Sequence, residues 1–136
     1  MRGIADTGFI VAFGNRNDHY HSWATALAKE ISDPLLTCEP VLAEAVFQLS
    51  SASLVLAHLK DGLLKISFGL DENLNHINEL AKKYEDRNPD LADLCLVRMS
   101  ELYPKHAILT VDNDFTVYRR NKRELIPLLR PPGRND

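Results

Sequence analysis

Short apolar runs alternate along the chain with segments whose apolar residues repeat at helical spacing. The short apolar runs predict buried strands at residues 3–5, 35–37, 63–68, 107–111 and 124–129. The helical spacing predicts helices over residues 8–13, 18–31, 40–49, 54–59, 71–84 and 88–102. Short apolar strands separated by helices are typical of a parallel sheet that is covered on both faces. We therefore expect an α/β fold, with three α/β/α layers around a short central parallel sheet.

Acidic residues follow two of the predicted strands. Asp6 comes directly after the first strand, and Asp112 follows the strand over 107–111, with Asp114 two residues later. Taken singly, each acid is explained equally well as a helix cap or a turn residue. In parallel sheets, however, ligands bind beyond the carboxyl ends of the strands. Two carboxylates at that edge would offer the oxygen ligands that a hard cation prefers.

Three further acids lie in predicted helices. Asp90 and Asp93 are three residues apart at the start of one helix, so they share a face. Their alternative role is to stabilise the helix N-terminus, which is worth about 0.3–1 kcal/mol for one acid. Glu44 lies among seven uncharged neighbours in residues 40–47. A partly buried carboxylate there is unfavourable unless a cation or a hydrogen-bond donor meets it; an exposed place on the helix flank is the alternative.

The composition is that of an ordinary single domain of 136 residues, with 45% apolar and 26% charged residues. No apolar run approaches the roughly 20 residues of a membrane span, and the N-terminus lacks the apolar stretch of a signal peptide. Cys38 and Cys95 lie far apart, without zinc-type spacing. Because each lies in a largely apolar segment, we interpret both as reduced core residues of a cytoplasmic protein.

The charge is divided unevenly along the chain. From Arg119 onward there are six basic and two acidic residues, a net +4, so residues 1–118 carry −7 of the total of −3. The basic residues Arg119, Arg120, Lys122 and Arg123 are candidates for contacts to a phosphate backbone, although a solvated basic surface explains them too. The prolines and the glycine in 130–136 predict an extended, basic tail, which leaves 1–129 as the folded domain.

Four short motifs carry the acids described above. They are Ile4-Ala5-Asp6-Thr7, Thr37-Cys38-Glu39-Pro40-Val41-Leu42-Ala43-Glu44-Ala45, Pro89-Asp90-Leu91-Ala92-Asp93-Leu94-Cys95-Leu96-Val97 and Leu109-Thr110-Val111-Asp112-Asn113-Asp114-Phe115. Each motif alone is weak. In this order and at these separations, the four resemble the PIN-domain family, particularly the VapC-like toxins of bacterial and archaeal toxin–antitoxin pairs. The resemblance extends from residue 4 to about 118.

The resemblance implies a PIN-like nuclease domain that hydrolyses RNA with the help of Mg²⁺ or Mn²⁺. It assigns catalysis to four acids, Asp6, Glu44, Asp93 and Asp112. Of these, Asp6, Asp93 and Asp112 would bind the metal, and Glu44 would orient the attacking water or ligate through water. It further implies an RNA substrate, an antitoxin partner and a homodimer, with no membrane association.

Two threonines beside these acids, Thr7 and Thr110, are candidates to hydrogen-bond the carboxylates, and strand-end capping is their alternative role. Other functions also remain open. One is a PIN-like module that binds a partner without catalysis, and another is a PIN nuclease of RNA processing or decay. Residues 112–116 also match the nucleophile motif of haloacid-dehalogenase-like phosphatases. That motif starts its fold, whereas only 20 residues follow Thr116 here, so we do not expect this function.

Overall fold

A parallel sheet of five short strands forms the centre of the structure, a computed structural model that describes residues 1–133. The strands lie in the order β3-β2-β1-β4-β7, with bounds Leu64–Ile66, Leu35–Thr37, Gly3–Ala5, Ala107–Leu109 and Leu128–Leu129. Ile4 pairs with Leu36 on one side and with Ile108 on the other. The N-terminal strand is therefore the middle of the sheet, and the residue after it stands at the centre of the carboxyl edge.

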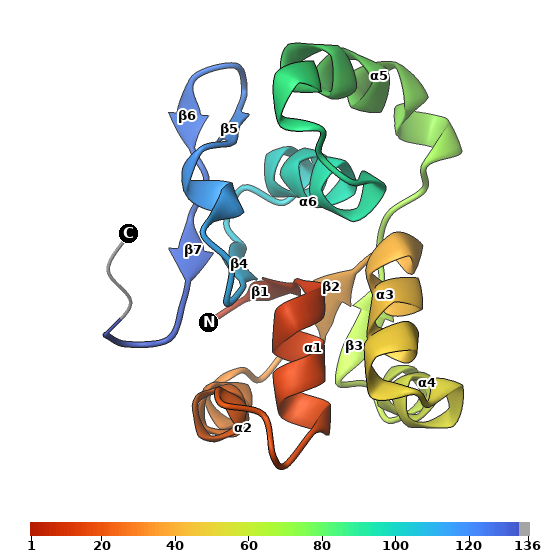
Figure 1. The fold of residues 1–136 in the computed structure, drawn as a ribbon, viewed down its shortest axis with the longest axis vertical. Coiled ribbons are helices and arrows are strands. Elements are labelled where there is room, and N and C mark those ends of the chain that lie inside the picture. Colours follow the sequence, from red (N-terminus) through yellow and green to blue (C-terminus); the bar gives the residue numbers. More distant parts are fainter. Residues whose placement is uncertain (134–136) are drawn as a thin grey trace.

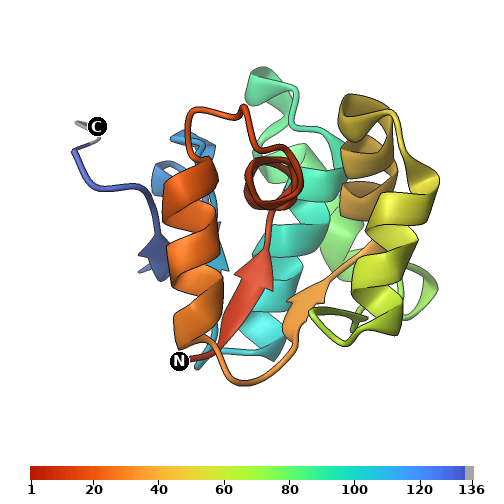
Figure 2. The ribbon, with the colours of Figure 1, turned by 90° about the horizontal axis from the view of Figure 1, so that it is seen from below.

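Helices cover both faces of this sheet (Figure 1). One side carries α1 and α2, with α3 and α4 beside α1, and the other carries α5 and α6, as the view from below also shows (Figure 2). Their bounds are Thr7–Gly14, His21–Glu30, Glu39–Leu49, Ala52–Lys60, Leu74–Lys83 and Leu91–Leu102. Three-residue 3₁₀ turns, η1, η2 and η3, occupy Asp71–Asn73, Glu85–Arg87 and Asp114–Thr116. The predicted three-layer α/β/α fold is confirmed.

The core forms where the helices meet the two central strands. Ile4, Ile108 and Leu109 are completely buried, as expected for strands of a sheet covered on both faces. Burial of each such side chain contributes roughly 1.5–3 kcal/mol. Cys38 and Cys95 are also buried and free, which confirms that they are reduced core residues.

Gly8 explains how α1 can lie so close to the segment after β4. A Cβ atom at this position would overlap with the side chain of Val111. Glycine therefore allows the first turn of α1, which begins next to Asp6, to pack directly against the residues that lead to Asp112. This close approach determines where two of the candidate acids lie.

The predicted boundaries differ from the structure mainly near the C-terminus. Residues 124–129 are not one strand, as predicted, but two. Glu124–Leu125 forms β6, which pairs in antiparallel fashion with β5, Arg119–Arg120, whereas β7 joins the parallel sheet beyond Pro127. Because proline has no N–H to donate, Pro127 interrupts the strand; its carbonyl accepts the N–H of Ile108 at 2.9 Å.

Elsewhere the predicted elements are present, with bounds that are the same or differ by a few residues. The second helix begins at His21 instead of Asp18, because the Asp18 carboxylate accepts the N–H of Tyr20 at 2.8 Å in a preceding turn. The strand predicted over 107–111 ends at Leu109. None of the helices in residues 1–133 is long and apolar enough to cross a bilayer. The last part of the predicted tail, residues 134–136, lies outside the described residues.

Candidate functional site

The site is centred on Asp6, which stands between the carboxyl ends of β1 and β4. Its backbone N–H donates to the carbonyl of Leu109 at 3.1 Å, so the end of β1 is attached to the end of β4. The Asp6 carboxyl is 6% exposed, and both of its oxygens are engaged. Oδ1 accepts the N–H of Thr7 at 2.7 Å, and Oδ2 accepts the hydroxyl of Thr110 at 2.7 Å. The prediction that Thr110 hydrogen-bonds an acid of the site is confirmed.

Burial makes the charged form of Asp6 unfavourable. It raises the pKa of this carboxyl from 3.8 to about 6. The hydrogen bonds from Thr110 and Thr7 oppose the rise, and the negative charges of Asp112 and Glu44 add to it. The three acids therefore interact across the end of the sheet, although they lie far apart in the sequence.

Glu44 reaches this site from α3 through a hydrogen bond. The hydroxyl of Thr7 donates to Oε1 of Glu44 at 2.6 Å, in a half-buried environment. The sequence expectation of a partly buried Glu44 that meets a donor is confirmed. Thr7 thus has two contacts at the site, because its N–H binds Asp6 and its hydroxyl binds Glu44.

Asp93 approaches from the first turn of α6, where Asp90 is the N-cap. The Asp90 carboxylate accepts the N–H of Asp93 at 2.8 Å, so the capping role of Asp90 is confirmed. Asp93 Oδ2 accepts the hydroxyl of Tyr118 at 3.2 Å. Burial raises the pKa of Asp93 from 3.8 to about 8, and the negative charges of Asp90, Asp6 and Asp114 add to the rise. Asp93 and Asp6 therefore repel each other across the site.

A cavity of about 180 Å³ opens beside Asp93. Its lining residues are Arg87, Asn88, Pro89, Asp90, Asp93, Asp114 and Tyr118. Arg87 is the only basic residue in this lining, and no side-chain hydrogen bond or ion pair holds its guanidinium within residues 1–133. The cavity thus combines three carboxylates with one cation that is available to an incoming anion.

The donor set fits a hard divalent cation. All the candidate ligands are carboxylate oxygens, which are the ligands that Mg²⁺ and Mn²⁺ prefer. Burial, with smaller contributions from neighbouring negative charges, raises the pKa values of Asp6 and Asp93, and a bound cation would favour their ionised forms. Within residues 1–133, no three acid, histidine or cysteine side chains converge as a preformed metal site. Asp112 is exposed; its backbone N–H donates to Thr110 Oγ1 at 3.0 Å.

The basic residues after Tyr118 do not line the acidic cavity. Arg120, predicted to meet phosphates, is 6% exposed and its guanidinium donates to the carbonyls of Ser100 and Pro104 and to the Glu124 carboxylate. Arg119 donates to the carbonyl of Thr116 at 2.7 Å. The prediction that Arg120 contacts RNA is therefore wrong, because the helix-end carbonyls and Glu124 satisfy its charge inside the fold.

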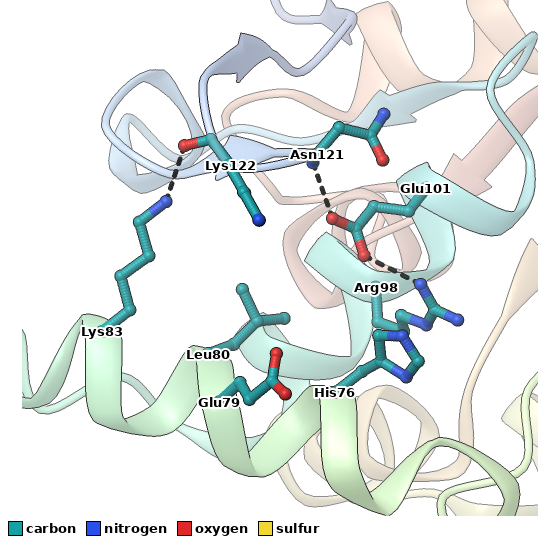
Figure 3. Close-up of a pocket in the computed structure, with 8 residues that line it drawn as sticks. All are labelled: His76, Glu79, Leu80, Lys83, Arg98, Glu101, Asn121 and Lys122. Carbon is teal, nitrogen blue, oxygen red and sulfur yellow. Dashed lines mark hydrogen bonds and ion pairs between the residues drawn. The ribbon is translucent and has the colours of Figure 1, made fainter.

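Lys122 borders a second cavity, of about 310 Å³, between α5, α6 and the β5–β6 turn (Figure 3). Its backbone carbonyl accepts Lys83 Nζ at 2.7 Å, and the Glu101 carboxylate binds both Arg98 and the N–H of Asn121. These polar groups fasten the turn to the two helices. The residues that line this cavity make these structural contacts, and none of the candidate acids is among them.

Two residues of the acidic cavity were missed in the sequence. Tyr118 is a buried aromatic residue, and its hydroxyl binds Asp93. Arg87 belongs to none of the four motifs. It is the last residue of the 3₁₀ turn η2, shortly before the N-cap of α6. Neither residue has a local pattern that would reveal its contact with the site.

Comparisons with known proteins agree with this geometry. The sequence matches the PIN domain over residues 4–121. No curated protein matches it significantly. Among solved structures, it is similar to the crystal structure of VapC20 from Mycobacterium tuberculosis, described as a toxin that cleaves the sarcin–ricin loop. The TM-score is 0.71, with 17% sequence identity, over 82% of this chain and 90% of that chain. At this identity the likeness shows a shared fold. Because the PIN-domain match spans most of its length and all four motifs, this chain belongs to the PIN-domain family.

Proposed function

We propose that this protein is a metal-dependent endoribonuclease, the toxin of a toxin–antitoxin pair. The observation that supports it most is the pair formed by Asp6 and Asp93, two mutually repelling carboxyls at the carboxyl edge of the sheet whose pKa values are raised. A site that concentrates uncompensated negative charge is suited to binding a cation. The membership of the PIN-domain family and the fold shared with a toxin that cleaves the sarcin–ricin loop support RNA as the substrate.

In this proposal, Asp6, Asp93 and Asp112 hold Mg²⁺ or Mn²⁺. The ion would lower the pKa of a water molecule and stabilise the charge that develops on the phosphate. Thr110 and the N–H of Thr7 fix the orientation of the Asp6 carboxyl through their hydrogen bonds.

Glu44 has a separate role. Its carboxylate would accept a hydrogen bond from the attacking water and so orient it. The Thr7 hydroxyl occupies Glu44 Oε1, so Oε2 is left for that water. Because the same threonine binds Asp6 through its N–H, the acid that would orient water is held in a fixed relation to the acid that would bind metal.

Arg87 supplies positive charge beside the acids, in place of the buried Arg120. We place its guanidinium on a phosphate of the RNA, because it shares a cavity with Asp93 and has no carboxylate partner within the described residues. Guanidinium groups bind phosphate oxygens in a bidentate manner. The contact is independent of base identity, so it would contribute affinity without sequence preference.

Homodimer formation is the second part of the proposal. Apolar side chains on the outer surface of α3 and α4 support it: Phe47 is 84% exposed and Leu56 is 58% exposed. On α5, Leu74 is 55% exposed. Large apolar side chains that are this exposed on a single chain are candidates for contact with a partner. We assign the α3–α4 surface to a second copy of the chain, and we further propose an antitoxin protein as partner and the cytoplasm as location.

A cleavage assay tests the proposed activity. Purified protein should cleave a structured RNA in Mg²⁺ or Mn²⁺ and should stop when EDTA is added. Asp6→Asn and Asp93→Asn should both abolish cleavage and remain folded, whereas Asp33→Asn, a change in an exposed surface ion pair, should cleave like the wild type. Cleavage that persists in EDTA, or in Asp93→Asn, would refute the metal-site proposal. RNA binding without any cleavage would favour the non-catalytic module.

The assay also separates the toxin from a nuclease of RNA processing or decay. Sequencing the fragments would identify the cut positions. A single cut in one structured RNA agrees with a toxin that inactivates its target, whereas many cuts along unstructured RNA indicate decay. Cleavage that ceases when a small DNA-binding protein encoded next to the gene is added would support the antitoxin partner.

A further inference from the structure

A carboxylate that binds a metal must be held in one orientation, and Asp93 has a single side-chain donor. The hydroxyl of Tyr118 donates to Asp93 Oδ2 at 3.2 Å, and no hydrogen bond engages Oδ1 within residues 1–133. Outer partners of this kind fix the geometry of metal ligands, and their removal typically lowers metal affinity or activity about 10–100-fold. Tyr118 is therefore placed to control one metal ligand without contacting the metal.

The surroundings of Tyr118 are rigid enough for this role. Its side chain is 4% exposed, and its ring packs edge-on against Tyr84 at 5.0 Å and against Phe115 at 5.6 Å between centroids. The Tyr84 hydroxyl accepts the N–H of Arg119 at 2.8 Å, so the backbone directly after Tyr118 is tied to the end of α5. An aromatic ring held on two sides in this way has little freedom to reorient.

The segment after Tyr118 is also fixed to the helix that carries Asp93. The guanidinium of Arg120 donates to the carbonyl of Ser100 in α6 at 2.8 Å. Asp93 lies in the first turn of α6 and Ser100 near its last turn, so the segment touches this helix near both ends. The donor and the acceptor of the Tyr118–Asp93 bond thus belong to one braced unit.

We propose that Tyr118 is a positioning residue that holds the Asp93 carboxylate for the metal, and that residues 118–125 form the brace that keeps it there. The proposal rests on the proposed metal-dependent function. The hydroxyl engages Oδ2 and leaves Oδ1 without a hydrogen-bond donor within residues 1–133, in a side chain that lines the cavity together with Arg87 and Asp114. Residues 118–125 thus act on the site through the position of Tyr118.

The test compares Tyr118→Phe with Tyr103→Phe. Each change removes one tyrosine hydroxyl and keeps the ring, but the Tyr103 hydroxyl donates to the carbonyl of Ser67 at 3.0 Å and not to an acid of the site. Mn²⁺ binding measured by calorimetry should be roughly 10-fold weaker in Tyr118→Phe and unchanged in Tyr103→Phe. The Mg²⁺ concentration for half-maximal cleavage should rise by a similar factor in Tyr118→Phe, while kcat at saturating Mg²⁺ should change much less.

The outcomes separate this proposal from the proposed function. If the wild type binds no Mn²⁺, the proposed metal site itself is wrong. If the wild type binds Mn²⁺ and Tyr118→Phe binds it equally well, only the role of Tyr118 is overturned. Near-ultraviolet circular dichroism and thermal unfolding check that both variants keep the fold. Equal losses of Mn²⁺ affinity in both variants would also overturn the proposal, because they would indicate general loosening of the aromatic packing.

Discussion

Asp93 should make the metal-free protein lose stability as the pH rises, which is the opposite of the usual effect of a paired carboxylate. Its pKa is about 8 in the fold and 3.8 in the reference state. Between these values the folded protein binds more protons than the unfolded chain. The free energy of unfolding therefore decreases with increasing pH from about pH 4 to about pH 8. Asp6, with a pKa raised to about 6, acts in the same direction up to that pH.

The size of the effect follows from the pKa difference. Each pH unit in this window changes the free energy of unfolding by about 1.4 kcal/mol for one group. From pH 4.5 to pH 7.5 this amounts to about 4 kcal/mol for Asp93. Because the Asp93 side chain is only partly buried, solvent screening reduces the contribution, and we expect about 2 kcal/mol. Asparagine cannot ionise and has nearly the same shape, so Asp93→Asn should remove this dependence.

Urea denaturation in EDTA at pH 4.5 and pH 7.5 measures the difference. The wild type should lose about 2 kcal/mol more stability than Asp93→Asn between the two pH values. Asp33→Asn, which alters an exposed ion pair of Arg2, is the matched control and should behave like the wild type. Addition of Mg²⁺ at pH 7.5 should stabilise the wild type but not Asp93→Asn. Parallel pH profiles for the wild type and Asp93→Asn would refute the reasoning, because Asp93 would then titrate near its ordinary pKa.

Three other predictions concern the cationic and apolar side chains. Arg120→Ala should lower the free energy of unfolding by about 3 kcal/mol in a urea titration, because it leaves Glu124 and two carbonyls without their donor. In the same titration, the control Arg123→Ala, at an exposed position, should change the free energy of unfolding by less than about 0.5 kcal/mol. Arg87→Ala should weaken RNA binding and reduce the slope of log affinity against log salt by about 0.7 in a fluorescence titration; an unaltered slope would mean that Arg87 does not touch RNA. Phe47→Glu should convert a dimer to a monomer in sedimentation experiments, and a wild type that is already monomeric at micromolar concentration would contradict the proposed interface.

Much of the fold could be predicted from the sequence because its signals are local. The apolar run at 3–5 and the run at 35–37 mark β1 and β2 with the same bounds, since buried strands of a parallel sheet are apolar on both faces. The cap at Asp90 is equally local, because it depends on one side chain and an N–H three residues later. The strand-end rule also placed Asp6 and Asp112 at one edge of the sheet, where their charges do interact.

Only the tertiary structure decided which residues that are distant in the chain contact each other. Thr110 binds Asp6 across 104 positions because β4 happens to be the neighbour of β1, and the sequence carries no signal of strand order. In the sequence, Tyr118 is one aromatic residue outside the four motifs and Arg120 is one base of a basic segment. Neither feature says which donor or acceptor the side chain meets. Their roles arise when residues 118–125 fold back onto α6. Local periodicity reports which side of an element is buried; the partner of a buried polar group is selected only when the packed elements bring donor and acceptor together.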